Sequence, residues 1–225
     1  AVCVEKKEEG LVIMKFSYQG IFLEILESLG EMPLPPYIHE KLKDKNRYQT
    51  IYAKELGSSA APTAGLHFTE EIFEKLKEKK VTLCYLTLEI GLGTFRPVEV
   101  EDLTKHKMDS EYYEISAHTA DVVNKAMHAK HNIVVVGTSA CRALETSTTA
   151  DGFLKQGRGW TDKFIYPPHV FHITQKLITN FHMPQSTLLM LACAMAERDL
   201  IMKAYKKAVK EKYRFYSSGD AMMIV

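Results

Sequence analysis

The chain has 225 residues, of which 46% are hydrophobic and 25% are charged, and its net charge is +1. This composition is that of a globular protein and excludes an intrinsically disordered segment, which combines low hydrophobicity with high net charge. Because 29 basic residues face 28 acidic ones, binding to nucleic acid or to an anionic membrane would need a local basic patch.

Apolar runs and cysteines indicate the compartment. The longest apolar run, residues 188–196, has nine residues, whereas a membrane-spanning helix needs about twenty. The four cysteines lie far apart without CxxC spacing, at Cys3, Cys84, Cys141 and Cys193. We therefore expect a soluble, cytoplasmic protein with reduced and mostly buried thiols, in preference to disulfides or metal ligands.

The N-terminal residues predict a hairpin followed by a helix. Residues 2–4 and 11–16 are rich in strand-forming residues and are joined by a charged turn. Residues 21–29 carry one apolar helical stripe that stops at Gly30. Three prolines then prevent regular structure, so we place a domain boundary there, between residues 1–30 and 31–225.

Beyond the boundary, helix and strand patterns alternate. Helices are predicted at residues 48–56, 69–79, 117–129, 139–148, 186–196 and 199–213, and strands at residues 81–88, 133–136, 163–166 and 176–179. Residues 133–136 are apolar on both faces, as in a central strand covered by helices. The fold class predicted is α/β, with a mainly parallel sheet flanked by helices.

Three loops follow predicted strands and open toward helices, at residues 89–96, 137–142 and 180–186. Open parallel sheets bind ligands at the carboxyl ends of their strands, where helix N-termini offer free N–H groups. We therefore expect these loops to form one site.

Several familiar sites are disfavoured. Gly91 and Gly93 begin a dinucleotide-binding pattern, but Arg96 stands in place of the third glycine and Pro97 follows it. A phosphate-binding P-loop is missing from the sequence. The histidines, including His128 and His131, lack partners at metal-ligand spacing, so no metal site is expected.

Two other segments each allow a structural and a functional interpretation. Residues 57–65 are small and precede His67, which suits either a tight connection or a close backbone approach to a ligand. The C-terminal helix combines lysines with nearby aromatics, as does the glycine-rich stretch around Trp160. Such a pattern is typical either of a solvated helix face or of binding to single-stranded RNA loops.

Six strings together carry a resemblance to a known family. They are PLPPYI (33–38), RYQTIYA (47–53), AAPTAGLHF (60–68), GLGTFRPV (91–98), TNFH (179–182) and GDAM (219–222). Their order and spacing resemble the S-adenosylmethionine:tRNA ribosyltransferase-isomerases of queuosine synthesis. The sequence departs from the usual pattern of that family at Glu89, Ser139, Gln185 and Ser218.

The resemblance implies an architecture and an activity. Residues 1–30 would be the end of an inserted β-barrel domain and its return, with more chain expected before them, and residues 31–225 the catalytic domain. The activity implied is transfer and isomerisation of the ribosyl group of S-adenosylmethionine onto an aminomethyl-7-deazaguanine at the tRNA wobble position. Epoxyqueuosine would form, and adenine and methionine would be released. S-adenosylmethionine would be consumed and no further cofactor used, in a monomer or weak dimer.

The resemblance also suggests residue roles. Because the sulfonium acidifies the ribose C5′ proton, a general base is needed, and His67 and His182 are the two candidates. Asp220 would orient the amine or adenine, while Arg96 and Arg142 would hold a carboxylate or phosphate. The remaining substrate-binding candidates are Thr63, Gly65, Gly91, Gly93, Thr94, Phe95, Thr138, Glu145 and Asn180. Contacts to tRNA are expected from Trp160, Lys206, Lys210 and Arg214.

Some of these roles have structural alternatives. Thr138 and Ser139 would either bind ligand or cap a helix, and Glu145 would serve as an acid or pair with Arg142. Two other functions compete with the main one: an S-adenosylmethionine-using transferase acting on a small amine, and a non-catalytic RNA-binding remnant.

Overall fold

The computed structural model describes residues 1–7, 12–30, 34–35, 37–38, 44–55, 57–91, 98, 100 and 102–225. The chain divides into two compact units, Ala1–Met32 and Pro33–Val225. Within the described residues, no helix is long and apolar enough to cross a membrane.

The first unit contains a hairpin and one helix. Strands β1 (Val2–Lys6) and β2 (Val12–Lys15) pair antiparallel, and α1 spans Phe22–Leu29. Gly30 ends α1, and its N–H donates to the Leu26 carbonyl. The hairpin and helix therefore lie where the sequence pattern puts them, while the assignment of this unit to a β-barrel stays a prediction.

The second unit holds two three-stranded sheets. In the first, β3 (Thr87–Glu89), β4 (Glu111–Ile115) and β6 (Gly157–Thr161) pair antiparallel in the order β3-β4-β6. In the second, the order is β5-β7-β8, formed by β5 (Val134–Val136), β7 (Lys176–Asn180) and β8 (Ala221–Ile224). Strands β5 and β7 run parallel, and β8 is antiparallel to β7.

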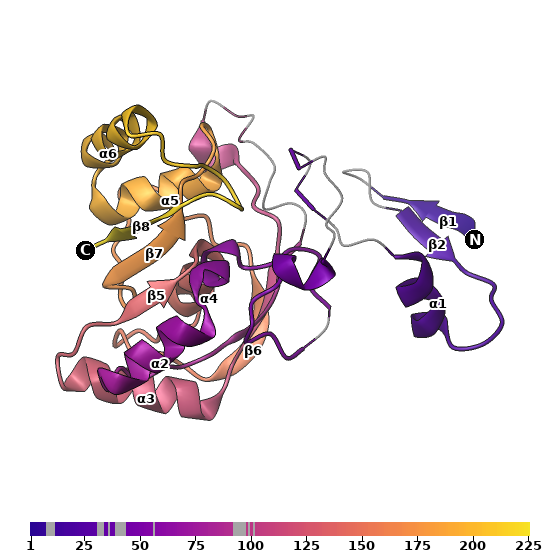
Figure 1. Ribbon diagram of the computed structural model, residues 1–225, viewed down its shortest axis with the longest axis horizontal. Coiled ribbons are helices and arrows are strands. Elements are labelled where there is room, and N and C mark those ends of the chain that lie inside the picture. Colours follow the sequence, from indigo (N-terminus) through magenta and orange to yellow (C-terminus); the bar gives the residue numbers. More distant parts are fainter. Residues whose placement is uncertain are drawn as a thin grey trace. The chain divides into compact units, whose positions relative to one another are not determined.

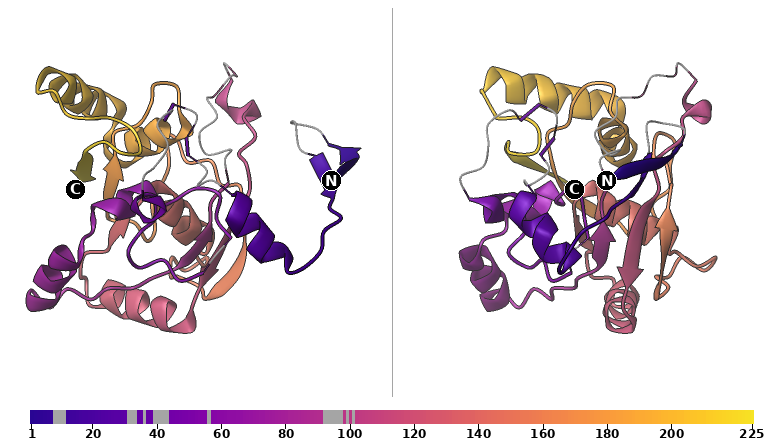
Figure 2. Two further views of the ribbon diagram at one scale, coloured as in Figure 1. Left: turned by 45° about the vertical axis from the view of Figure 1, so that its right-hand side comes forward. Right: turned by 90° about the vertical axis from the view of Figure 1, so that its right-hand side faces the viewer.

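Five α-helices surround these sheets: α2 (Glu70–Glu78), α3 (Ala117–His128), α4 (Thr138–Thr146), α5 (Thr187–Ala196) and α6 (Arg198–Lys210) among the described residues. Hydroxyl side chains accept N–H groups at the starts of three of them: Thr69 for α2, Ser116 for α3 and Ser186 for α5. Figures 1 and 2 show α6 and α3 at opposite ends of this unit.

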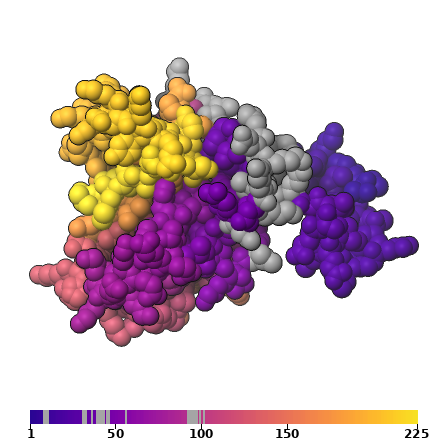
Figure 3. Space-filling view, in the orientation of Figure 1, coloured from indigo at the N-terminus to yellow at the C-terminus, as the bar shows by residue number. Residues whose placement is uncertain are grey.

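Helix α4 is the centre of the core. It contacts β5, β6 and β7, so it joins the two sheets. All its residues from Thr138 to Glu145 are buried. The apolar cluster around it includes Leu177 of β7, Leu191 of α5 and Ile201 of α6. On one face, the C-terminal segment (yellow) borders the purple segment that contains α2 (Figure 3).

The fold is mixed α/β, but a mainly parallel sheet is not confirmed. Among the described strands of the second unit, only β5 and β7 pair parallel. Three local predictions also need correction. The described part of residues 48–56 contains no α-helix and follows a 3-10 turn, Lys45–Tyr48. Residues 81–86 are not strand, and residues 163–166 follow β6 instead of forming a strand. Strands β4 and β6 form through pairing with each other, which local pattern does not reveal.

Candidate functional site

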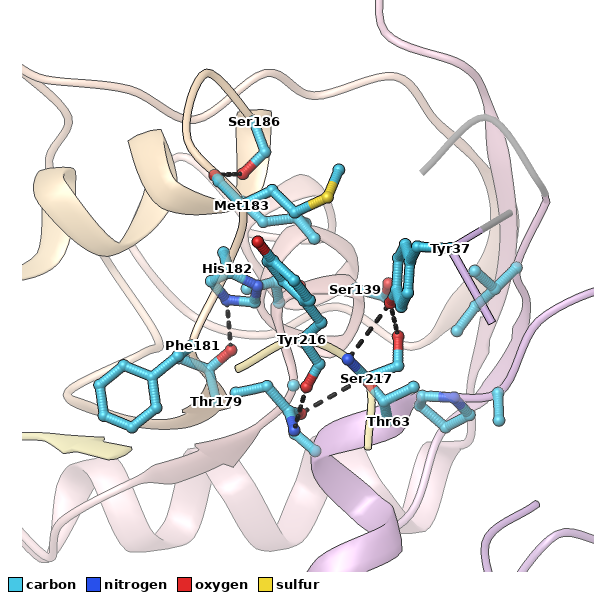
Figure 4. Close-up of a pocket in the computed structure, with 18 residues that line it drawn as sticks. Tyr37, Thr63, Ser139, Thr179, Phe181, His182, Met183, Ser186, Tyr216 and Ser217 are labelled. Atoms are coloured by element: carbon cyan, nitrogen blue, oxygen red, sulfur yellow. Dashed lines mark hydrogen bonds between the residues drawn. The ribbon is translucent and has the colours of Figure 1, made fainter. Parts of the chain in front are cut away.

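A cavity lies at the edge where β5 and β7 end. Because the two strands are parallel, their carboxyl ends meet there, as ligand sites of α/β sheets do. The cavity measures about 720 Å³, solvent at its mouth included, and residues 61–64, 137–139, 179–183 and 216–217 line it together with Tyr37, Ile90, Ser186 and Leu188 (Figure 4). All three predicted loops therefore contribute to one site.

The turn from β5 into α4 depends on Gly137. Its φ of 93° lies in the left-handed region that L side chains rarely adopt. Its N–H donates to the Ile178 carbonyl of β7 over 2.9 Å, which extends the parallel ladder to the edge of the cavity. This geometry places Thr138 and Ser139, the first residues of α4, in the cavity wall.

His182 lines the cavity and is held on two sides. Its Nε2 lies 2.7 Å from Thr179 Oγ1, and its backbone N–H donates to Tyr205 Oη of α6 over 2.9 Å. Burial penalises the charged imidazolium and lowers the pKa of His182 to about 4. The imidazole is therefore neutral at pH 7.

His67 lies behind the cavity wall. It ends the 3-10 helix Thr63–His67 and does not line the cavity, because Asn180 stands between them. The amide N–H of Asn180 donates to His67 Nε2 over 3.1 Å. Burial lowers the pKa of His67, the Asp220 carboxylate raises it in part, and Arg214 lowers it. The ring is thus neutral with its proton on Nδ1.

The orientation of the Asn180 amide is set by its neighbours. Thr63 Oγ1 donates to Asn180 Oδ1 over 3.3 Å, and Asn180 Nδ2 also donates to the Tyr216 carbonyl over 3.3 Å. Since a carbonyl can only accept, the NH₂ group must face Tyr216 and His67. Thr63 and Asn180 both line the cavity, and their binding of substrate stays a prediction.

Tyr37, Tyr216 and Ser217 also line the cavity. Tyr37 Oη and Ser217 Oγ share a hydrogen bond, and the Ser217 N–H donates to Tyr37 Oη over 3.2 Å. The rings of Tyr37 and Tyr216 lie 5.2 Å apart. Sequence reasoning did not predict Tyr37 or Ser217 for the site, and it considered Tyr216 only as one of the aromatics beside the C-terminal lysines, although Tyr37 belongs to one of the strings that carry the family resemblance.

Asp220 is engaged outside the cavity. Its carboxylate accepts from the Arg214 backbone N–H over 2.8 Å and from the Arg214 guanidinium over 2.6 Å and 3.2 Å. These hydrogen bonds lower the pKa of Asp220. Asp220 and Arg214 therefore form an ion pair with each other at the turn that precedes β8. Neither residue lines the cavity.

Arg142 and Glu145 are placed in the core, which corrects the predicted ligand roles. Arg142 is 3% exposed and donates to Glu111 Oε2 over 2.9 Å. It also donates to the carbonyls of Lys163, Thr161 and Asp109. Glu145 does not pair with it. Instead, Glu145 accepts the backbone N–H groups of residues 172, 173 and 174. The hydrogen bonds of Arg142 and Glu145 thus connect α4 to the neighbouring segments of the core.

The predicted glycines have other roles or lie outside the described residues. A Cβ on Gly65 would meet Tyr52 Oη at 2.1 Å, so this glycine permits close packing of a phenol. Gly91 follows Ile90 but does not line the cavity. The predictions for Gly93, Thr94, Phe95 and Arg96 lie outside the described residues. Four residues depart from the usual pattern of the family that the sequence resembles. Ser139 lines the cavity, whereas Glu89, Gln185 and Ser218 are exposed.

The residues predicted to contact tRNA are at the surface. Lys206 and Lys210 lie on the exposed face of α6, whose other face buries Ile201, Tyr205 and Ala208. Trp160 of β6 is 65% exposed, and its ring packs edge-on against Tyr112. Among the residues that the structure describes, no group of three or more His, Cys, Asp or Glu is arranged to hold a metal ion.

Comparisons with known proteins agree with the resemblance seen in the sequence. A family model described as queuosine biosynthesis protein matches residues 1–224. The S-adenosylmethionine:tRNA ribosyltransferase-isomerase of Clostridioides difficile (strain 630) is 55% identical over 221 residues, which cover 98% of this chain and 65% of that protein. The crystal structure of S-adenosylmethionine tRNA ribosyltransferase from Thermotoga maritima matches with a TM-score of 0.58 and 39% identity. That match covers 72% of this chain and 51% of the other.

Proposed function

This chain belongs to the family of queuosine biosynthesis proteins, and on that premise we propose that its protein is an S-adenosylmethionine:tRNA ribosyltransferase-isomerase. It transfers and isomerises the ribosyl group of S-adenosylmethionine onto an aminomethyl-7-deazaguanine at the tRNA wobble position. Epoxyqueuosine in tRNA, adenine and methionine are the products. S-adenosylmethionine is consumed, and the reaction uses no other cofactor.

The observation that carries this proposal is the single cavity built from separate loops. Residues 61–64, 137–139, 179–183 and 216–217 come together in its wall. A neutral imidazole, that of His182, forms part of this wall. A ligand that enters the cavity would therefore lie beside that imidazole.

We assign removal of the ribose C5′ proton to His182. The C5′–H electron pair forms a C4′–C5′ double bond as the C4′–O4′ bond breaks, and the proton moves to the imidazole. The freed oxygen forms a carbonyl at C1′ as adenine leaves. The imidazolium gives its proton to the departing adenine. The neutral amine of the base then adds to C4′ of the C4′–C5′ double bond, and the electron pair left on C5′ attacks the C1′ carbonyl to close a five-membered carbon ring. The resulting C1′ alkoxide displaces methionine from C5′ to form the epoxide, as the C5′–S bond breaks and the ammonium proton passes to solvent.

Aromatic rings support binding of the sulfonium. Tyr37 and Tyr216 both line the cavity, with ring centroids 5.2 Å apart. A cation over such a face gains about 0.5 to 2 kcal/mol. These rings are the groups that we assign to the positively charged sulfur.

Helix α6 provides the surface that we propose for tRNA. Its exposed lysines attract phosphates, and binding of this kind weakens as salt rises. Tyr205, on the buried face of the same helix, accepts the N–H of His182, so α6 contacts the cavity on one face and carries the lysines on the other. A wobble base in a single-stranded loop can be turned out of its stack at modest cost.

We also propose that residues 1–30 form the end of a β-barrel domain. The protein is proposed to act as a monomer or weak dimer.

Adenine release by the full-length protein tests the proposal. The protein is incubated with S-adenosylmethionine and tRNA carrying the aminomethyl-7-deazaguanine, and adenine and methionine are quantified. We expect equimolar release that requires the modified tRNA and stops with tRNA carrying guanine at the wobble position. Release supported by small amines and not by tRNA would assign the site to a different transferase. Binding of tRNA without binding of S-adenosylmethionine would indicate a non-catalytic protein.

A further inference from the structure

The start of α4 presents unpaired backbone donors to the cavity. Gly137 precedes the helix and has no side chain to cap it. The N–H groups of Thr138, Ser139 and Ala140 have no acceptor within the helix, since the first intrahelical bond is from Cys141 to Gly137. The aligned peptide dipoles add partial positive charge at this end.

Two buried hydroxyl groups at the same place also lack partners. Thr138 and Ser139 are each 7% exposed, and both line the cavity. Within the described ranges, neither hydroxyl has a hydrogen bond, whereas Thr146 and Ser147 at the other end of α4 both do. Neither the Thr138 nor the Ser139 oxygen is sealed from the cavity, because the fully buried side-chain atoms without a partner among the described residues are Tyr48 Oη and His169 Nε2. The hydroxyls of Thr138 and Ser139 are therefore placed to bond to an atom that enters the cavity.

Charged side chains are missing from the described part of the cavity wall. None of the described side chains that line the cavity belongs to Lys, Arg, Asp or Glu, and Arg142 is directed to Glu111. Backbone N–H groups and hydroxyls remain as donors. Together they match an anionic oxygen, for which helix N-termini are favourable sites.

We propose that the N-terminus of α4, with the hydroxyls of Thr138 and Ser139, binds the α-carboxylate of S-adenosylmethionine. This rests on the proposed function, which puts the sulfonium compound in the same cavity. A carboxylate presents two oxygens to two hydroxyls and a set of parallel N–H groups. A phosphate of tRNA has the same anionic chemistry, and the experiment separates the two sources.

The test compares S-adenosylmethionine with its decarboxylated analogue, which lacks the carboxylate. Dissociation constants are measured by calorimetry for the wild-type protein, Ser139→Ala and Ser139→Thr. We expect the wild type to bind the analogue at least tenfold more weakly. Ser139→Ala should lose about tenfold in affinity for S-adenosylmethionine and little for the analogue, since a charge-assisted hydrogen bond is lost. Ser139→Thr should retain the affinity because it keeps the hydroxyl.

Ser147→Ala is the matched control, because it removes a hydroxyl from the opposite end of α4, where it bonds to Tyr113. It should leave the preference for the carboxylate unchanged. Equal wild-type affinity for the two compounds would overturn the carboxylate site and leave the proposed function standing. Ser139→Ala raising the KM for tRNA, with the preference intact, would assign the anion site to a phosphate. Failure of the wild type to bind either compound would overturn both proposals.

Discussion

The side chain of Asn180 stands between His67 and the cavity that His182 lines. Its amide N–H reaches His67 Nε2 over 3.1 Å, while its oxygen accepts from Thr63. The two histidines, equivalent candidates in the sequence, therefore occupy different places. His182 faces the cavity, and His67 orients the residue in front of it.

Replacing Asn180 should raise the pKa of His67. The Asn180 N–H bonds to the unprotonated nitrogen and so favours the neutral ring. In Asn180→Ala, we expect the pKa of His67 to move upward, toward its ordinary value near 6.5, as measured by NMR titration of the imidazole protons. Asn132→Ala, at an exposed asparagine, is the control. An unchanged pKa in Asn180→Ala would show that the amide does not hold the tautomer.

The two histidines should differ in their effect on turnover. His182→Gln removes the group in the cavity and should lower the rate of adenine release by about 10²- to 10⁴-fold, the contribution of a general base. His67→Gln should have a smaller effect, because the ring acts only through Asn180. Single-turnover adenine release at saturating substrates measures both. The reverse order would move the base to His67.

Acid should destabilise the protein through His182. Its pKa is about 4 in the folded state and near 6.5 when unfolded, so between these values the unfolded chain binds the extra proton. Stability is therefore full above pH 6.5 and falls as the pH drops toward 4. We expect a loss of about 2 kcal/mol between pH 7.5 and pH 5. Urea unfolding at both values should show a weaker pH dependence for His182→Gln, and an identical dependence would contradict the assignment.

Arg142 should prove essential to stability. Breaking a buried ion pair by removing one partner costs about 3 to 5 kcal/mol, and the pair of Arg142 with Glu111 is almost fully buried. Arg142→Ala should therefore lower the free energy of unfolding by that amount in urea titrations. Arg198→Ala, at an exposed ion pair, is the control. A variant of normal stability that lost affinity for S-adenosylmethionine would restore the ligand role predicted from sequence.

Charge reversal on α6 should weaken tRNA binding. Lys206→Glu with Lys210→Glu replaces two exposed cations, so the KM for tRNA should rise and its salt dependence should become shallower. The affinity for S-adenosylmethionine should hardly change, because neither lysine lines the cavity. Lys79→Glu at the end of α2 is the matched control. Unaltered tRNA kinetics in the double variant would exclude this face of α6.

Local signals were sufficient to predict much of this site. Hydroxyl caps and apolar spacing locate α2, α3 and α5 to within a residue or two. The loops after β5 and β7 were expected to meet because parallel strands end at one edge, and they do. His182, Thr63, Thr138 and Asn180 all line the cavity, and their roles toward a ligand stay predictions.

The features of the site that the sequence did not predict depend on contacts between residues far apart in the chain. Arg142 follows a glycine turn, and from the sequence it could bind either an anionic ligand or an acidic side chain of the protein. In the structure its partner is Glu111, which lies 31 positions away. The glycine-rich residues 157–159 resemble a loop until β4 pairs with them. Tyr216 contributes to the site through its backbone carbonyl, which residue identity does not report.

The hydrogen bond between Tyr37 and Ser217 links residues 180 positions apart. Closing so long a stretch of chain costs conformational entropy, and the bond belongs to connecting segments and not to a sheet or a helix. Segments from both sides of the second unit therefore share one wall of the cavity, so a truncation on either side of this unit would leave the wall incomplete.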